Sequence, residues 1–420
     1  MKPRQRYSLG ALAKGAFHNH RKWDRAWHSP PLQPEYDVVI IGGGGHGLAT
    51  AYYLARNHGI RKIAVLEKNW IGGGNSGRNT AVIRSNYLRE DSIRFFDKSL
   101  QLYETLSRDL NYNIMFSQRS EVDVLLTNTS MRNMRRRSLN MSLQGVEFRM
   151  LSADEVRSRI PALAPMRECR LPILGGSVQQ RAGIARHDAI VWGYARAASA
   201  YGVDIIQNIS INAIRRAADG AVSELDTDHG PIRASKIATV AGGENYSVAQ
   251  MAGIRLPLQT FNLQAFVSEP IKPVLDVVVN CPDLQVYLSH SDKGELVIGG
   301  ITDAQQISFR RGGKLAVLDS TVSGLLELFP TFRRLKLLRQ WGGALEFARD
   351  GSPIVSKTSI KGFYVSAGWW GGFKAIPAGG LTLAHTIAED EPHPLSACYR
   401  LNRFDTLNFL MEGGTTVPIH

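Results

Sequence analysis

The sequence predicts an α/β fold in a two-domain, α+β arrangement, with one domain on a parallel sheet and a second on a mixed or antiparallel sheet. Three observations predict it. A strand, a glycine-rich turn, a helix and a second strand follow one another near the N-terminus. The chain has 420 residues, more than one ordinary domain. Its 44% hydrophobic and 21% charged residues are typical of a globular protein.

The first strand and its turn carry a phosphate-binding pattern. Residues 38–41 form a short apolar run of β-branched type, which suits a buried parallel strand. Gly42, Gly44 and Gly47 then fit G-x-G-x-x-G. The first glycine allows a tight turn, the second lets the backbone approach a pyrophosphate, and the third lets the helix pack on the strand. The N-terminus of that helix offers free N–H groups to phosphates.

A second strand, residues 64–67, ends in an acid. Glu67 lies 20 residues after Gly47, where an acidic side chain is expected to hold a ribose hydroxyl. A glycine pattern alone is a weak signal. The order of strand, glycine turn, helix, strand and acid favours a Rossmann-like dinucleotide site over a structural turn.

A second glycine-rich loop, residues 72–77, follows the acid directly. NAD enzymes usually continue there with ordinary βαβ units, whereas flavin-dependent amine oxidases use such a loop to pass the flavin ring. On these residues the chain resembles the family of FAD-dependent amino-acid and amine oxidoreductases, which includes D-amino-acid oxidase and monomeric sarcosine oxidase. The resemblance covers roughly residues 36–395. Its further motifs are residues 238–243, 256–258, 267–270, 341–343, 350–353 and 368–374.

Longer runs resemble one subfamily, the β subunits of heterotetrameric sarcosine oxidases. They are residues 6–9, 42–55, 77–87, 185–196 and 291–299. This resemblance implies that FAD takes a hydride from the N-methyl carbon of sarcosine. It further implies that electrons pass to FMN and reduce O2 to H2O2. The imine would pass to tetrahydrofolate on an α subunit, giving glycine and 5,10-methylenetetrahydrofolate, in an assembly with α, γ and δ subunits.

The resemblance implies a noncovalent FAD. The residues it implies for this site are Gly42, Gly44, Gly45, His46, Gly47, Glu67, Lys68, Asn75, Ser76, Arg78, Asn79, Thr80, Ile211, Gly368, Gly371, Gly372 and Lys374. His46 is expected to pack or to tune electron transfer, and not to act as a base. The cysteine that links FAD in monomeric sarcosine oxidase is expected near Glu346, and this chain has none there.

Arg84 and Lys374 are the predicted catalytic residues. A carboxylate anchor needs cations in a closed pocket, where an ion pair is less screened. Residues 80–84 and 371–374 resemble the segments of monomeric sarcosine oxidase that carry its carboxylate-binding arginine and lysine. Taken singly, either side chain is more often a surface charge. Ala81 replaces a second arginine of that enzyme.

His187 is the predicted attachment point of FMN. A lone histidine is usually structural or on the surface. Residues 186–188, however, resemble the place where the β subunits link covalently to FMN through its 8α-methyl group. Imidazole suits such a link because it is neutral and nucleophilic near pH 7. Residues 295–299 lack the oxygen-activating lysine of monomeric sarcosine oxidase, so FMN is the expected outlet for electrons.

Each domain is predicted to be built from separate stretches of chain. The predicted parts are a basic N-terminal arm over 1–34, an FAD-binding domain over 36–115, 187–258 and 341–395, a substrate domain over 116–186 and 259–340, and a C-terminal tail over 396–420. Phe17, Trp23 and Trp27 of the arm would pack on a partner or on the chain's own body, and the sequence leaves both open. Residues 121–126 alternate like a strand, and the basic run 131–137 is expected on the solvated face of a helix.

Composition excludes several classes of function. The net charge of +13 comes without a nucleic-acid motif, so it indicates a basic surface and anionic ligands, among them flavin phosphates and a polyglutamylated folate. No apolar run approaches about 18 residues and no secretory signal is recognisable, so neither a membrane span nor export is predicted. Cys169, Cys281 and Cys398 are widely spaced and odd in number, which predicts no metal site and reduced thiols in a cytoplasm.

The residues leave three functions open. The first is the sarcosine oxidase activity described above. The second is a related multi-subunit dehydrogenase for N-methylglutamate or an opine, with a larger pocket and another electron acceptor. The third is a flavin-binding subunit without its own chemistry, against which Arg84 and Lys374 argue.

Overall fold

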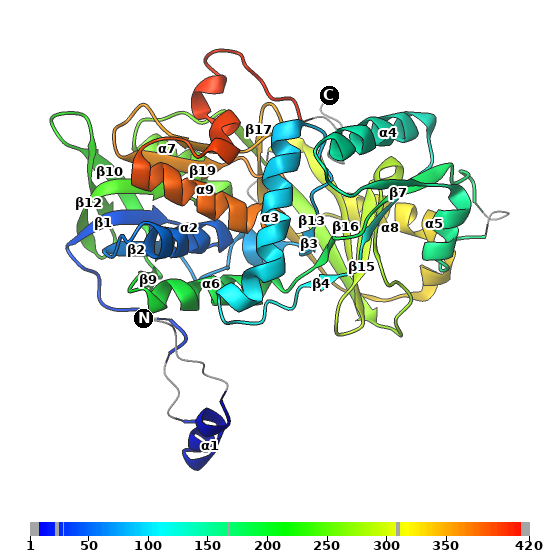
Figure 1. Cartoon of the computed structure of the whole chain (residues 1–420), viewed down its shortest axis with the longest axis horizontal. Helices are drawn as coiled ribbons and strands as arrows, with labels where there is room; N and C mark the ends of the chain where they lie inside the picture. The colour runs from blue at the N-terminus through cyan, green and yellow to red at the C-terminus, as the bar shows by residue number, and fades with distance from the viewer. Residues whose placement is uncertain (1–7, 22–24, 28, 166–168, 308–310, 413–420) are drawn as a thin grey trace.

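Two eight-stranded sheets organise the chain, and each forms the centre of one lobe (Figure 1). The computed structural model describes residues 8–21, 25–27, 29–165, 169–307 and 311–412, and the side chains of 301–307 are outside that description. Helix α3 (Glu90–Asp109) lies between the lobes in Figure 1. The first sheet has a parallel core with antiparallel strands beside it, and the second sheet is mixed, so the predicted fold class is confirmed.

The first sheet holds the glycine-rich turn at its centre. Its strands are β10 (Ile211–Arg216), β11 (Val222–Thr227), β12 (Gly230–Thr239), β1 (Glu35–Ile41), β2 (Ile63–Glu67), β9 (Asp204–Gln207), β18 (Ile354–Lys357) and β19 (Phe363–Ala367). Strand β1 pairs in parallel with β2 and β12, and β12 pairs in parallel with β19. Residues 38–41 are buried, because helices cover a parallel sheet on its faces. Helix α2 (Gly45–Asn57) connects β1 to β2 and packs against α6 (His187–Ala200) and α9 (Ile376–Glu389).

The second sheet is mixed. Its order is β17 (Leu337–Ala348), β13 (Leu258–Pro270), β16 (Glu295–Ile307), β15 (Val286–His290), β14 (Val278–Cys281), β5 (Glu121–Leu125), β7 (Gly175–Gln179) and β6 (Arg149–Leu151). Only the β14–β5 pair is parallel among its described pairings. Helices α5 (Ala153–Arg159) and α8 (Leu315–Leu328) pack on this sheet. A small third sheet joins β3 (Val82–Ile83), β8 (Gly183–Ile184) and β4 (Ser117–Gln118).

Shorter elements complete the two lobes. They are α1 (Leu9–Phe17), α4 (Asn128–Leu143), α7 (Asn245–Met251), and the 3-10 helices η1 (Asn75–Arg78), η3 (Gly242–Glu244), η4 (Pro282–Leu284), η5 (Pro330–Arg334), η6 (Gly372–Ala375), η7 (Pro394–Tyr399) and η8 (Leu401–Arg403). No helix in the described ranges is both long and apolar enough to cross a membrane. The predicted domain bounds remain a prediction. Strand β17 spans the predicted bound at residue 341 and pairs along its length with β13 of the second sheet.

Two predicted surface features differ in part from the structure. The basic run on α4 is exposed at Arg132, Arg135 and Arg136, whereas Arg137 is half-buried. Helical periodicity turns that last residue toward the body. In the arm, α1 stands away from the body (Figure 1) and Phe17 is exposed, while Trp27 packs against the core. Trp23 lies outside the described residues.

The end of the described chain is tied to the turn after β17. Arg403 is 4% exposed and donates from Nε and Nη2 to the carboxylate of Asp350, which is fully buried, at 2.8 and 2.9 Å. Glu412 accepts hydrogen bonds from the backbone N–H groups of Leu88 and Arg89, just before α3. The C-terminal segment therefore fastens the turn after β17 to the residues that precede α3.

Candidate cofactor and substrate site

A single cavity of about 770 Å³ joins the glycine-rich loops to the second sheet. Its walls include Gly42 and Glu67 at the ends of β1 and β2, and Gln264 and Tyr287 on β13 and β15. Ligands of open α/β sheets bind at the carboxyl ends of the strands, where this cavity begins. Sixteen predicted residues line it: Gly42, Gly44, Gly45, His46, Glu67, Lys68, Asn75, Ser76, Arg78, Asn79, Thr80, Arg84, Ile211, Gly371, Gly372 and Lys374.

The first glycine loop has the shape that a pyrophosphate needs. Gly42 has φ +121°, and a Cβ there would lie 2.4 Å from the Val240 carbonyl oxygen. A Cβ on Gly47 would lie 2.0 Å from the Gly42 carbonyl oxygen, so Gly47 packs the helix on the turn and does not line the cavity. Gly44 is open toward the cavity, with only Ser76 Oγ within reach at 3.3 Å. The loop therefore leaves room for phosphates beside the N-terminus of α2, and FAD fits here.

Glu67 is fixed at the end of β2 by backbone donors. Its Oε2 accepts the N–H of Gly43 and its Oε1 accepts the N–H of Asn69, both at 2.9 Å. Each carboxylate oxygen retains a second acceptor site. Ile211, the first residue of β10, lines the same end of the cavity.

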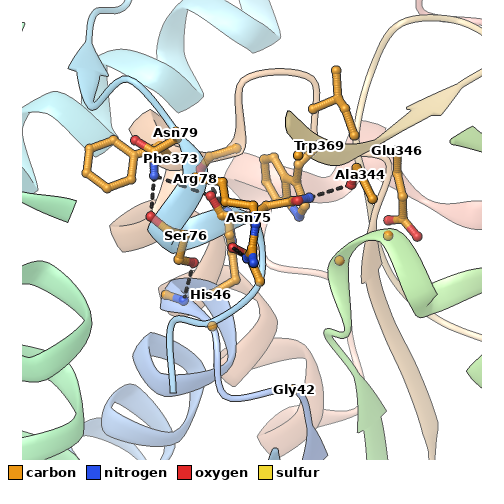
Figure 2. A pocket seen from close by; sticks show the side chains of 18 of the residues that line it. Gly42, His46, Asn75, Ser76, Arg78, Asn79, Ala344, Glu346, Trp369 and Phe373 are labelled. Carbon is orange, nitrogen blue, oxygen red and sulfur yellow. Dashed lines mark hydrogen bonds between the residues drawn. The ribbon is translucent and has the colours of Figure 1, made fainter. Parts of the chain in front are cut away.

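The second glycine loop is held between α2 and β17. Asn75 Nδ2 donates to the Ala344 carbonyl at 2.5 Å, and Ser76 Oγ accepts the N–H of Gly45 at 3.0 Å (Figure 2). Arg78 donates to the carbonyls of Gly73 and Gly74 inside the loop. The polar side chains of the second glycine loop therefore hold that loop in place through these hydrogen bonds. The loop forms one wall of the cavity.

The closing segment contacts the first loop through His46. Nε2 of His46 donates to the Gly372 carbonyl at 2.8 Å, and its ring stacks on Trp369 with centroids 4.5 Å apart. Burial lowers the pKa of His46 to about 4, so the ring is neutral at physiological pH. Gly368 does not line the cavity. Its N–H donates to Glu346 at 3.2 Å, and a Cβ there would lie 3.1 Å from Ala348 Cβ.

The predicted catalytic cations lie at the far end of the cavity. Arg84 follows β3 and Lys374 lies in η6, and both line the cavity. Nη1 of Arg84 donates to Asn86 Oδ1, and its Nε lies 3.5 Å from Glu121 Oε1. Burial, and then the neighbouring Arg84, lower the pKa of Lys374 to about 7. Helix α3 fixes η6, because Ser99 Oγ donates to the Lys374 carbonyl at 2.7 Å.

Glu121 pairs with Arg84 and interacts electrostatically with Lys374, and the sequence did not single it out. It is 3% exposed at the start of β5 and lines the cavity. Burial raises its pKa to about 7, against the opposing effect of Arg84. All five residues of β5 are buried, so the polar face of the alternating strand faces other protein groups and not solvent. Glu121 and Asp123 in this short apolar strand were the sequence signal for a buried acidic site. Buried carboxylates are rare unless they are paired, so two of them in one strand indicate partners nearby.

Glu346 was also missed as a cavity residue. It accepts from the N–H of Asn245 at 3.1 Å, from its Nδ2 at 2.9 Å, and from the N–H of Gly368 at 3.2 Å. Figure 2 places it beyond Ala344 on the β17 side of the pocket. Burial raises its pKa to about 7. None of the residues that line the cavity is a cysteine.

His187 lies outside this cavity. It is the first residue of α6, is half-buried, and is not among the residues that line the cavity. Arg186 and Asp188 on either side form an ion pair at 2.7 Å. Burial lowers the pKa of His187, which favours a neutral imidazole. Helix α6 packs against α2 and η1, which carry the two glycine loops.

Comparison with known proteins identifies the family. Residues 37–386 match the family described as DAO, FAD dependent oxidoreductase. Over 97% of its length the chain is 46% identical to the sarcosine oxidase subunit beta of Rhodobacter capsulatus, and it covers 98% of that protein. It is 45% identical to the sarcosine oxidase subunit beta of Rhizobium meliloti, over 97% of each chain. The chain belongs to the FAD dependent oxidoreductases, in the sarcosine oxidase β-subunit family.

This membership confirms the predicted family and reaction class. The chain is an FAD-dependent amine oxidoreductase. Among solved structures, L-proline dehydrogenase from P. horikoshii is similar with a TM-score of 0.83 and 22% identity, over 89% of this chain and 99% of that one. At that identity the likeness establishes the fold alone.

Proposed function

We propose that this chain is the catalytic β subunit of a multi-subunit sarcosine oxidase, which removes the N-methyl group of sarcosine oxidatively. The observation that carries the proposal is the cavity itself, in which the glycine loops, the half-buried Arg84 and the buried Lys374 line one continuous space. A flavin-binding subunit that catalyses no reaction would not need two cations at the end of the cavity away from the glycine loops.

FAD would be held noncovalently by the two glycine loops and the closing segment. Gly44 and Gly45 would face the pyrophosphate, Glu67 the ribose, and Ile211 the adenine side. His46 would support the flavin end through packing on Trp369. Bound FAD supplies the acceptor for the hydride of the substrate, and FMN supplies the outlet to oxygen. The absence of cysteine from the cavity lining supports a noncovalent FAD.

Lys374 and Arg84 would bind the substrate carboxylate. A buried cation strengthens such a contact because the surroundings screen it little. Anchoring one end of sarcosine holds its N-methyl carbon in one orientation, which is the main contribution a protein makes to hydride transfer. Trp369 and Trp370 line the same space and would exclude water from it.

His187 would hold FMN covalently, outside the FAD cavity. Its lowered pKa supports a nucleophilic, neutral imidazole, and the contact of α6 with α2 and η1 supports a short route between the two flavins. Oxygen would be reduced to peroxide there. The imine product would pass to tetrahydrofolate on an α subunit, giving glycine and 5,10-methylenetetrahydrofolate, and γ and δ subunits would complete the assembly.

Substrate identity is tested by anaerobic mixing of the purified assembly with candidate amines. Sarcosine is expected to bleach the FAD absorbance within the enzyme's turnover time. N-methylglutamate carries a second carboxylate that would face Glu121, and it is expected to react far more slowly. Fast bleaching by N-methylglutamate and none by sarcosine would assign the chain to the related dehydrogenases.

A further inference from the structure

Two charged groups in the cavity keep unused hydrogen-bonding capacity among the described residues, although Oε1 of Glu121 lies 3.5 Å from Nε of Arg84. Nζ of Lys374 makes no hydrogen bond or ion pair there, although the residue is only 9% exposed. Oε2 of Glu121 is buried and also has no hydrogen-bond partner. Burying a charge without a partner is costly. A cation and a carboxylate oxygen that both lack a hydrogen bond in one cavity fit a ligand that carries both charges.

The groups that face Glu121 come from four elements. They are Arg84 after β3, Lys374 in η6, Asp123 on β5 and Arg137 on α4. Asp123 lies two residues along the strand, on the same face, and its carboxylate already accepts from Asn280 Nδ2 at 2.6 Å and Ser177 Oγ at 2.7 Å. Glu121 is therefore the acid of this cluster with an oxygen left to serve a ligand.

We propose that Glu121 accepts the proton of the substrate's secondary ammonium group before hydride transfer. This inference rests on the proposed function and names a further catalytic residue for it. An N-methyl amino acid is a zwitterion in water. Its carboxylate would pair with Lys374 and Arg84, and its ammonium with Oε2 of Glu121. Hydride transfer needs the nitrogen lone pair, and an ammonium group has none.

The step balances as a proton transfer followed by oxidation of the substrate. The N–H bond breaks with its electron pair left on nitrogen, and an O–H bond forms on Oε2 of Glu121. The lone pair then forms the C=N bond as the N-methyl carbon loses a hydride to FAD, the acceptor that the proposed function requires. The substrate is oxidised by two electrons and FAD is reduced by two.

The electrostatics of the cluster support the direction of this transfer. Burial beside two cations lowers the pKa of a bound ammonium, just as it lowers the pKa of Lys374 to about 7. Burial raises the pKa of Glu121 to about the same value. Donor and acceptor are thereby matched near neutral pH, which is the condition for efficient general base catalysis.

The test uses the whole assembly with Glu121→Gln, Glu121→Asp and, as a control, Glu155→Gln on the exposed face of α5. Two ligands separate the roles. Sarcosine has both charges, whereas methoxyacetate has the same length and carboxylate but an ether oxygen in place of nitrogen. The rate of FAD bleaching by sarcosine is measured from pH 6 to 10, and methoxyacetate affinity from the flavin absorbance change.

Glu121→Gln is expected to slow bleaching at pH 7 by roughly 10²- to 10⁴-fold. The remaining rate should rise about tenfold per pH unit toward pH 10, because unprotonated sarcosine must then come from solution. Methoxyacetate should bind as tightly or more tightly, since one negative charge has gone. Glu121→Asp should restore the wild-type shape of the pH profile. Glu155→Gln should behave as wild type.

Other outcomes overturn the proposal. If Glu121→Gln weakens sarcosine and methoxyacetate alike and keeps the wild-type pH profile, Glu121 only holds Arg84 in place. If Glu121→Gln reacts at the wild-type rate, the residue has no part in proton transfer. If wild-type FAD is not bleached by sarcosine at all, the proposed function fails first, and the assignment of Glu121 fails with it.

Discussion

Nε2 of His46 donates a hydrogen bond at 2.8 Å to the carbonyl of Gly372, 326 residues further along the chain. A carbonyl oxygen only accepts, so this bond fixes the tautomer of His46 with its proton on Nε2. It joins the first glycine loop to the segment that carries Lys374. The two ends of the chain that form the cavity are thus coupled through one neutral imidazole.

His46 should make the assembly sensitive to acid. Its pKa is about 4 in the folded chain, against an ordinary 6.5, so the unfolded chain binds more protons between those values. The stabilisation from neutral His46 is complete above pH 6.5 and is lost as pH falls toward 4, by roughly 3 kcal/mol in total. The drop in thermal midpoint between pH 7.5 and pH 4.5 should be smaller in His46→Asn than in wild type. An equal drop in both would show that this histidine does not titrate as described.

Removing the buried Arg403 side chain should destabilise the fold strongly. Arg403→Met leaves the fully buried Asp350 without its partner, which costs about 3–5 kcal/mol. The exposed pair of Lys357 with Asp390 offers the control, and Lys357→Met should change the free energy of unfolding by about 1 kcal/mol or less. Denaturant unfolding of both variants measures the difference. Equal effects would mean that the buried pair does not fasten the C-terminal segment.

A side chain at Gly44 should exclude the cofactor. Gly44→Val would place two methyl groups where the loop is open toward the cavity, and the purified protein should lack FAD. Gly312→Val is the control, because that glycine is exposed and a Cβ there meets nothing within 4 Å. The flavin absorbance per chain is the measurement. Full FAD occupancy in Gly44→Val would place the pyrophosphate elsewhere.

His187 should carry a flavin after denaturation. Acid-denatured wild-type assembly should keep FMN on a tryptic peptide that contains His187 and release FAD into solution. His187→Asn should lose that adduct and most oxygen turnover while sarcosine still bleaches FAD, because the first step needs the FAD cavity alone. His229→Asn, at an exposed histidine, is the matched control. Normal oxygen turnover in His187→Asn would leave a single-flavin enzyme.

The glycine loops were predictable from sequence because their constraints are local. Gly42 and Gly47 are required by contacts within one strand–turn–helix unit, and neighbouring residues in the chain signal such a unit. Glu121 was not predictable in the same way. It meets Arg84 and Lys374 only because β5 pairs with β7 and β14 and because α3 holds η6 against them.

Arg137 and β17 illustrate the same limit. A basic run predicts a solvated helix face on average, but which arginine turns inward depends on the body against which α4 packs. The domain bound at residue 341 was predicted from the motif at residues 341–343. In the structure, β17 begins at Leu337 and pairs with β13 from that residue onward. Contacts between residues far apart in the sequence decide how Arg137 is buried and where β17 begins, and spacing along the chain does not encode them; the domain bound itself stays a prediction.

Anaerobic bleaching of FAD by sarcosine, in wild type and in Lys374→Met, tests the central claim most directly. Losing one charge-assisted contact with the substrate carboxylate should cost about 2–3 kcal/mol, a fall of roughly 30- to 150-fold in kcat/KM with FAD still bound. Arg84→Ala should fall similarly. Lys361→Met removes an exposed lysine and should leave the rate unchanged. Wild-type bleaching in both Lys374→Met and Arg84→Ala would contradict the account, because the cavity would then bind no carboxylate through these cations.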